Sequence, residues 1–348
     1  MTFVMLIIYD NYHFYILEHN DRIITVKVIK LKGSINMSKV IEIDGLVKRY
    51  KELVALDHFN LEIEEGEIFG LLGPNGSGKS TTISCILGLL KYDKGDVKVF
   101  GKSMDASSYE SKKDIGVVLQ NVAVFEELNV EENIDYFCGL YIKDKKLRKQ
   151  YVDEAIEFAG LEEFRKFLPK KLSGGLLRRL NIACGIAHKP KLIFMDEPTV
   201  AVDPQSRNKI LEGIVELNKK GATIIYTSHY MEEVEQICTR IAIMDQGKNL
   251  AIGTKEQLKD MIKTGESIQA EIFELSEEII DEVKKLPHVY KVEYVDNHLK
   301  VHYTKGQRNL LRLIDFFKEH NIQFGRVYSE LPTLNDVFLE ITGKELRD

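Results

Sequence analysis

Short apolar runs alternate with helical patterns over most of the chain. Five of these runs are bounded by glycine, proline or polar residues and predict strands, at residues 67–72, 115–119, 192–195, 223–227 and 240–245. Such alternation of strands and helices is typical of a mostly parallel sheet covered by helices. The pattern therefore predicts an α/β fold over residues 37–265.

One segment inside this region has no strand pattern. Between residues 130 and 168 the apolar side chains recur at helical spacing, first at Ile134, Phe137, Leu140 and Tyr141 and then at Val152, Ile156 and Ala159. We expect an all-helical subdomain here, inserted into the α/β core over about residues 121–185.

The last 83 residues change pattern again. A strand is predicted at 267–273, a helix at 277–285, two strands on either side of Asp296-Asn297, a helix at 307–319 and a strand at 323–329. This β-α-β-β-α-β order predicts a small ferredoxin-like α+β module at residues 266–348.

The first 36 residues are rich in aromatic and β-branched side chains and predict a strand pair with Asn20-Asp21 at the turn. A new alternating pattern begins after Met37. We expect Met37 to be the natural start, because Lys32-Gly33-Ser34 can be encoded by a purine-rich ribosome-binding sequence. The alternative is a genuine N-terminal extension over residues 1–36.

Composition narrows the class of protein. The 348 residues are 44% hydrophobic and 29% charged, which excludes collagen-like, disulfide-rich and strongly disordered proteins. The net charge of −6 gives no reason to expect nucleic acid as a partner, although a local basic patch stays open. The four cysteines are widely separated and predict free thiols rather than a zinc or redox site. No stretch approaches the roughly 18–20 consecutive apolar residues of a membrane-spanning helix.

A phosphate-binding loop follows the first predicted strand of the sheet. Residues 73–80 read Gly-Pro-Asn-Gly-Ser-Gly-Lys-Ser and fit the pattern G-x-x-x-x-G-K-[ST] between a strand and a helix. Backbone N–H groups and the helix N-terminus would cradle the phosphates, Lys79 would reach the β- and γ-phosphates, and Ser80 would ligate Mg²⁺. The expected nucleotide-binding residues here are Gly73, Pro74, Asn75, Gly76, Ser77, Gly78, Lys79, Ser80 and Thr81.

Two carboxylates end the apolar run at 192–195. The run would place Asp196 at the sheet edge beside the Mg²⁺, and Glu197 would orient or deprotonate the attacking water. A surface acidic pair after a strand is the alternative. The pair narrows the chemistry towards nucleoside-triphosphate hydrolysis.

The sequence Leu172-Ser-Gly-Gly-Leu176 precedes a predicted helix. With the motifs above, it resembles the LSGGQ signature of the ATP-binding cassette (ABC) ATPases, except that Leu176 replaces the glutamine. The resemblance spans about residues 39–256. It implies an ABC cassette of the RecA-like P-loop NTPase fold, with an antiparallel β subdomain and a helical insertion. It also implies that Ser173, Gly174 and Gly175 contact the γ-phosphate of ATP.

Four further residues match positions of the same family. Tyr50 resembles the aromatic residue that stacks on adenine, and Gln120 resembles the glutamine that contacts Mg²⁺ and the water. Asp203 resembles the aspartate that crosses the dimer interface, and His229 resembles the histidine that contacts the γ-phosphate. The resemblance thus implies Glu197, His229, Gln120 and Lys79 as catalytic residues and Ser80, Gln120 and Asp196 as metal ligands.

The resemblance also implies partners. Each ATP would lie between the phosphate loop of one subunit and the signature loop of another, in a head-to-tail pair with a second copy or a homologous ATPase subunit. The segments 120–133 and 331–347 are similar to bacterial drug, antibiotic and sodium exporters whose membrane permease is a separate chain. We therefore expect a location at the cytoplasmic face of the cell membrane, with Phe125 and Phe137 as candidate permease contacts. A non-transport ABC ATPase is the alternative.

Overall fold

The computed structural model describes residues 3–9, 12–19, 22–30, 38–306 and 308–343. These fall into two compact units, Met1–Ser38 and Lys39–Asp348. In the first unit, β1 (Phe3–Tyr9), β2 (Tyr12–His19) and β3 (Arg22–Lys30) pair antiparallel in that order. The predicted strand pair is thus a three-stranded sheet. Its expected Asn20-Asp21 turn and the expected start at Met37 lie outside the described residues.

A six-stranded sheet forms the centre of the second unit. Its order is β13-β12-β6-β11-β10-β9, parallel except for the edge strand β13. Five of these strands match the predicted ones to within one residue at either end. The bounds are β6 (Ile68–Leu72), β9 (Ile115–Val118), β10 (Leu192–Asp196), β11 (Thr223–Ser228), β12 (Arg240–Asp245) and β13 (Lys248–Gly253).

Both faces of this sheet are buried, which explains why its strands are continuously apolar. On one face, Ile193, Met195 and Tyr226 pack with α6 (Pro204–Lys219), α7 (Met231–Ile237) and α8 (Lys255–Asp260). On the other, Phe69 and Phe194 pack with α1 (Lys79–Ile86) and a second, antiparallel sheet. That sheet has the order β5-β4-β7-β8, with β4 (Lys39–Tyr50), β5 (Leu53–Glu64), β7 (Lys94–Val99) and β8 (Lys102–Ser103), and α2 (Tyr109–Lys112) follows it in the chain.

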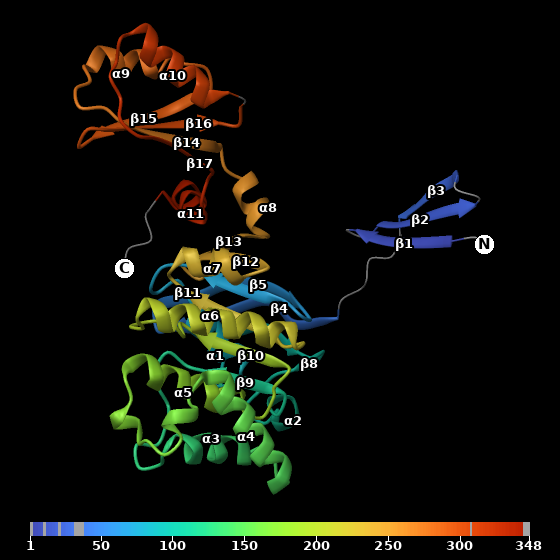
Figure 1. Cartoon of the computed structure of the whole chain (residues 1–348). Coiled ribbons are helices and arrows are strands. Elements are labelled where there is room, and N and C mark those ends of the chain that lie inside the picture. Colours follow the sequence, from blue (N-terminus) through green and yellow to red (C-terminus); the bar gives the residue numbers. More distant parts are fainter. Residues whose placement is uncertain (1–2, 10–11, 20–21, 31–37, 307, 344–348) are drawn as a thin grey trace. The chain divides into compact units, whose positions relative to one another are not determined.

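Three helices make a subdomain with a core of its own. They are α3 (Val130–Gly139), α4 (Lys145–Ala159) and α5 (Gly174–Ile186), and short 3₁₀ turns at Glu162–Phe164 and Pro169–Lys171 connect α4 to α5. Their apolar residues meet in one cluster around Ile134, Val152 and Ile156, as the helical spacing predicts. Figure 1 shows the three helices gathered together, in green, beyond β9 and β10.

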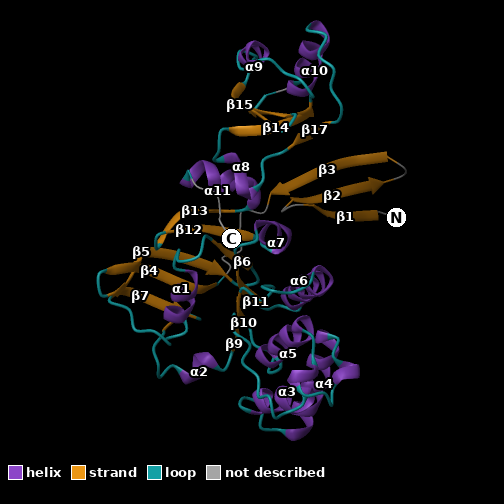
Figure 2. Ribbon diagram, turned by 90° about the vertical axis from the view of Figure 1, so that its left-hand side faces the viewer, coloured by secondary structure: helices purple, strands orange, loops and turns teal. Residues whose placement is uncertain are grey.

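A four-stranded antiparallel sheet follows the cassette. Its order is β15-β16-β14-β17, with β14 (Thr264–Glu271), α9 (Glu277–Val283), β15 (Val289–Val295), β16 (His298–Thr304), α10 (Asn309–Glu319) and β17 (Val327–Glu330). This is the ferredoxin-like order predicted from the sequence. Figure 2 shows α9 and α10 on one face of the sheet, where Phe317, Leu313 and Val283 pack on Ile268 and Val301.

The final helix returns to the cassette. Helix α11 (Leu334–Thr342) packs against α7 and α8, and its Leu334, Val337 and Phe338 are buried in the core of the central sheet. No helix was predicted here. The expected accessory region 266–348 therefore contributes part of the cassette's own core.

Two expectations from composition hold in the described residues. The four cysteines, Cys85, Cys138, Cys184 and Cys238, are buried free thiols. Nowhere in the ranges given above does a helix reach the length and apolar character that crossing a bilayer requires.

Candidate active site

The phosphate loop connects β6 to α1 in a turn that only small residues allow. Gly78 has a φ of 109° and forms the N-cap of α1, and a Cβ atom there would lie 2.9 Å from the carbonyl oxygen of Ala55. A side chain at this position would force the loop away from β5. The glycine thus lets the loop lie close to the antiparallel sheet while α1 directs its first N–H groups into the space beside it.

Lys79 lies folded into this loop. Its Nζ donates to the carbonyl oxygens of Gly73, at 2.7 Å, and Pro74, at 3.2 Å, and lies 3.9 Å from Glu197 Oε1. The residue is only 5% exposed, and this burial lowers the pKa of Lys79, while the carboxylates of Glu197 and Asp196 act in the opposite direction. The loop therefore holds a buried cation whose nearest partners are two neutral carbonyl oxygens. An anionic phosphate in their place would stabilise the charge further.

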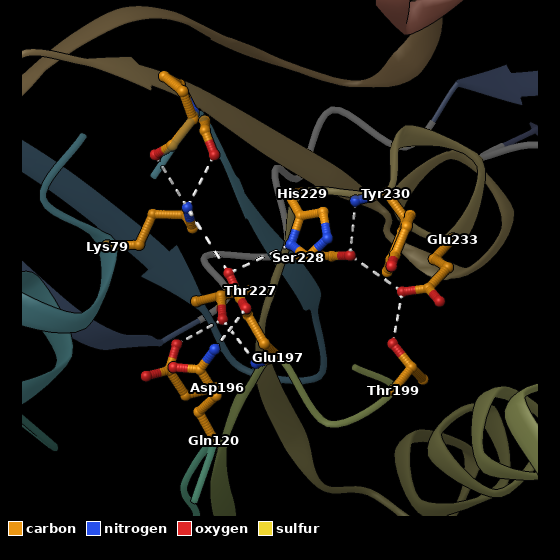
Figure 3. A network of polar contacts seen from close by, with 12 residues as sticks. Lys79, Gln120, Asp196, Glu197, Thr199, Thr227, Ser228, His229, Tyr230 and Glu233 are labelled. Atoms are coloured by element: carbon orange, nitrogen blue, oxygen red, sulfur yellow. Dashed lines mark hydrogen bonds and ion pairs between the residues drawn. The ribbon is translucent and has the colours of Figure 1, made fainter. Parts of the chain in front are cut away.

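The other predicted catalytic residues lie around the Glu197 side chain (Figure 3). Gln120 Nε2 donates to Glu197 Oε2 at 2.9 Å, and His229 Nδ1 lies 3.4 Å from Glu197 Oε1. The Glu197 backbone has a φ of 48°, a region that costs a non-glycine residue about 1–3 kcal/mol. Three segments far apart in the sequence, those of Lys79, Gln120 and His229, thus converge on one carboxylate.

Thr227 holds the neighbouring carboxylate in place and was not predicted. Its Oγ1 donates to Asp196 Oδ1 at 2.6 Å and accepts from the Glu197 N–H at 2.9 Å. Thr227 is fully buried at the end of β11, next to β10, and only the pairing of these two strands brings it to the acidic pair. The bonds fix the Asp196 carboxylate and the Glu197 backbone.

A cleft of about 630 Å³ opens over the loop. It is lined by nine of the predicted residues, namely Tyr50, Asn75, Gly76, Gly78, Lys79, Ser80, Thr81, Gln120 and Glu197. Tyr50 ends β4 and is 46% exposed, and Lys48 Nζ lies 5.0 Å from the centre of its ring. Gln246 and Lys248 also line the cleft and were not predicted, because they follow β12 far along the chain.

Four other predicted residues, Ser173, Gly174, Gly175 and Asp203, form a second group outside that lining. Ser173 caps α5 by accepting from the Leu176 N–H, and Asp203 caps α6 by accepting from the Ser206 N–H. The two caps are neighbours, since a Cβ atom on Gly175 would lie 3.0 Å from Asp203 Oδ2. The signature loop and Asp203 thus form a surface of their own, and none of these residues lines the cleft over the phosphate loop.

Arg178 connects the two groups. Its Nη1 donates to the Gln120 carbonyl oxygen at 2.5 Å and its Nη2 to the Val200 carbonyl oxygen at 3.5 Å. Asn181, one helical turn further along α5, donates to the Leu119 carbonyl and accepts from the Ala123 N–H. The segment around Gln120 is therefore fixed to the helix that follows the signature loop.

A parallel sheet with a phosphate loop, two carboxylates at the end of a neighbouring strand and a cleft above them defines a P-loop nucleotide-binding protein. The family model described as ABC transporter matches residues 56–200. The chain is 38% identical over 311 residues to the linearmycin resistance ATP-binding protein LnrL of Bacillus subtilis (strain 168), covering 89% of this chain and all of that protein.

Two further matches are also ATP-binding proteins of this kind. The chain is 33% identical to Nod factor export ATP-binding protein I of Rhizobium sp. (strain N33), over 89% of this chain and 99% of that protein. A solved structure of the ATP-binding cassette MJ0796, a post-hydrolysis dimer bound to ADP and Pi, matches with a TM-score of 0.57 and 28% identity, over 62% of this chain and 98% of that one. The chain therefore belongs to the ABC transporter family, as an ATP-binding subunit that hydrolyses ATP.

Proposed function

We propose that the cleft binds Mg²⁺-ATP in one orientation, with the adenine on Tyr50 and the β- and γ-phosphates on Lys79 and residues 73–81. The exposed ring of Tyr50 and the buried ammonium of Lys79 lie in the lining of the same cleft, which supports this orientation. Binding an anionic phosphate would stabilise the charged form of a lysine that burial disfavours.

The residues present suit a magnesium ion. Asp196 Oδ1 is occupied by Thr227, and its Oδ2 remains for a ligand; Gln120 donates through Nε2, which leaves its amide oxygen for the same purpose. Ser80 adds a hydroxyl from the cleft lining. Oxygen atoms with a single carboxylate, completed by substrate phosphates, are what Mg²⁺ prefers. The ion would neutralise charge on the transferred phosphoryl group.

Glu197 would act as the general base. Its carboxylate is 7% exposed and is contacted by Lys79, Gln120 and His229, and this convergence is the single observation that carries the proposal. Gln120 and His229 would hold the attacking water between Glu197 and the γ-phosphate. The protein contributes positioning and electrostatic stabilisation, with no covalent intermediate.

Two copies would complete each site. Ser173–Gly175 and Asp203 form a surface apart from the cleft, so a second copy or a homologous ATPase subunit would bring its own signature loop to this ATP. The post-hydrolysis dimer of MJ0796, which carries ADP and Pi, is a cassette of the same family and supports this arrangement.

The work driven by ATP would be export through a separate membrane permease, at the cytoplasmic face of the cell membrane. Relatives named for linearmycin resistance and Nod factor export support export, and a drug, an antibiotic, a lipid-like compound or an ion would be the cargo. The permease would dock beside Gln120, where Phe125 and Tyr136 are exposed and their rings lie 4.8 Å apart. Phe137, the other candidate from the sequence, packs partly into the helical subdomain.

The test of hydrolysis is Glu197→Gln. Loss of the base should slow ATP turnover by about two to four orders of magnitude while ATP still binds. Turnover is measured by phosphate release and binding by a fluorescent ATP analogue, with and without Mg²⁺. Turnover at the wild-type rate would remove Glu197 from its role.

The test of export is co-purification of the chain from native membranes in detergent. Retention of an integral membrane subunit, lost when Phe125 and Tyr136 are both changed to Ser, would support the permease. Ribosomes or DNA in its place would favour a non-transport ABC ATPase.

A further inference from the structure

A second buried carboxylate lies behind the proposed catalytic residues. Glu233, in the first turn of α7, is 3% exposed and does not line the cleft. Its Oε2 accepts from three hydroxyls, Tyr226 Oη at 2.6 Å, Ser228 Oγ at 2.9 Å and Thr199 Oγ1 at 2.8 Å. Figure 3 shows Glu233 between Ser228 and Thr199.

These hydroxyls come from two segments that carry proposed functional residues. Ser228 directly precedes His229, and its Oγ also accepts from the Tyr230 N–H at 2.9 Å, so it fixes the backbone on both sides of the histidine. Thr199 lies between Glu197 and Asp203, in the stretch that leads to the α6 cap. One carboxylate oxygen thus joins the histidine segment to the Asp203 segment.

The other oxygen extends the connection to α6. Arg207 Nε lies 3.3 Å from Glu233 Oε1, and the Arg207 guanidinium carbon lies 4.6 Å from the centre of the Tyr230 ring. The Tyr230 ring in turn lies 4.1 Å from the His229 ring. Arg207 belongs to the first turn of the helix that Asp203 caps, where its backbone N–H donates to the Asp203 carbonyl.

A buried carboxylate has to be compensated by partners, because removing an ion from water costs free energy. Here the charge is matched by Arg207 and by hydroxyl donors whose bonds to a carboxylate are stronger than bonds between neutral groups. Without Glu233, the three hydroxyls would lose their common acceptor, and the link left between Thr199 Oγ1 and Tyr226 Oη, 3.4 Å apart, is a longer contact.

We propose that Glu233 is a positioning residue for ATP hydrolysis, which fixes His229 and the Thr199–Asp203 segment relative to each other. The inference rests on the proposed function, since it acts through His229 and Asp203. It adds that one carboxylate fixes the positions of two parts of the same chain. One is His229, on the γ-phosphate side of the cleft, and the other is the segment with Asp203, which would face the partner subunit. A displacement of either segment would weaken the chemical step without removing a contact to ATP.

The experiment is Glu233→Gln, which keeps the shape, removes the charge that pairs with Arg207 and weakens the acceptor that the three hydroxyls share. We expect kcat to fall about 10- to 100-fold, because of misplaced catalytic groups. The ATP affinity and KM should stay within about twofold, since no ATP contact is lost. Unchanged kcat in a folded Glu233→Gln protein would overturn the proposal.

A double-mutant cycle with His229→Ala separates positioning from general loss of structure. If Glu233 acts through His229, Glu233→Gln should lower turnover far less in the His229→Ala background than in the wild type. Equal factors in both backgrounds would overturn the proposal. Wild-type turnover in His229→Ala alone would instead contradict the proposed function, so the two failures are distinguishable.

Glu67→Gln is the matched control. Glu67 is another buried carboxylate, 6% exposed, paired with Arg240 Nη1 at 2.9 Å, but it precedes β6 at the end remote from the phosphate loop. We expect its kcat to stay at the wild-type value. Should Glu233→Gln not fold, Ser228→Ala and Thr199→Val each detach one segment, and unchanged kcat in both would overturn the proposal.

Discussion

Lys79, the proposed phosphate ligand, is a cation whose charge is disfavoured by burial. Burial lowers the pKa of Lys79 from its usual value of 10.5, so the unfolded chain binds this proton more tightly than the folded protein does. Between the lowered pKa of the folded protein and 10.5, the unfolded chain holds this proton more often than the folded protein does. The contribution of Lys79 to the free energy of unfolding therefore rises with pH in this range.

The prediction compares the wild type with Lys79→Met in the absence of nucleotide. As the pH rises from 7 towards 10, the wild type should gain free energy of unfolding relative to the variant, because its buried ammonium loses the unfavourable charge. Denaturant unfolding at several pH values measures this difference. A difference that does not change with pH would contradict the assigned burial of the charge.

The site residues that the sequence predicts are those whose proposed roles follow from local spacing. Lys79 and Ser80 belong to a contiguous motif, and Asp196 and Glu197 end one apolar run, so each could be recognised within about ten residues. Glu233, Thr227 and Lys248 could not be recognised in this way. Their places depend on strand pairing and on contacts with segments far away in the chain, such as that of Glu233 with Thr199.

At the scale of elements, strands were predicted well because burial on both faces leaves continuous apolar runs. The missed helix α11 also carries local signals. Its apolar residues Leu334, Val337, Phe338 and Ile341 have helical spacing, and Thr333 with Asp336 forms a capping box at its start. The sequence therefore predicts the helix once these signals are read, but not its position in the cassette core.

Helix α11 supplies the prediction at this scale. Phe338 is 1% exposed and lies in the same cluster as Val234 and Ile237 of α7. Phe338→Ala should lower the free energy of unfolding by about 3–5 kcal/mol, because it leaves a cavity beside α7. Ile341→Ala, on the same helix but 36% exposed, should change it by less than about 0.5 kcal/mol. Equal losses in denaturant unfolding would contradict the packing of α11.

This packing also determines what a deletion of the C-terminal module would remove. A deletion after residue 265 removes both the ferredoxin-like sheet and the three buried side chains of α11. Loss of ATPase activity in such a protein would follow from the opened core alone, whatever the module does. Helix α11 packs against α7, which carries Glu233. A deletion that keeps α11 would therefore be needed to tell the effect of the ferredoxin-like sheet from the effect of the lost core helix.

At the scale of the whole molecule, the proposed catalytic residues divide into two surfaces. The cleft holds the phosphate loop and Glu197, while Ser173–Gly175 lies with Asp203 on the other surface. In the proposed head-to-tail pair, such a chain would carry one half of each of two sites. The rate of hydrolysis should therefore rise more than linearly with protein concentration at levels where dimers dissociate.

Mixing two inactive variants tests this division directly. Lys79→Met damages only the cleft, and Gly174→Asp damages only the signature surface, because a Cβ atom on Gly174 meets nothing closer than 3.9 Å within its own chain. Each variant alone should be inactive, since every site in its dimers lacks one half. An equal mixture forms mixed dimers with one complete site, so phosphate release should recover to at most about a quarter of the wild-type rate. If each chain hydrolysed ATP by itself, the mixture would stay as inactive as its components.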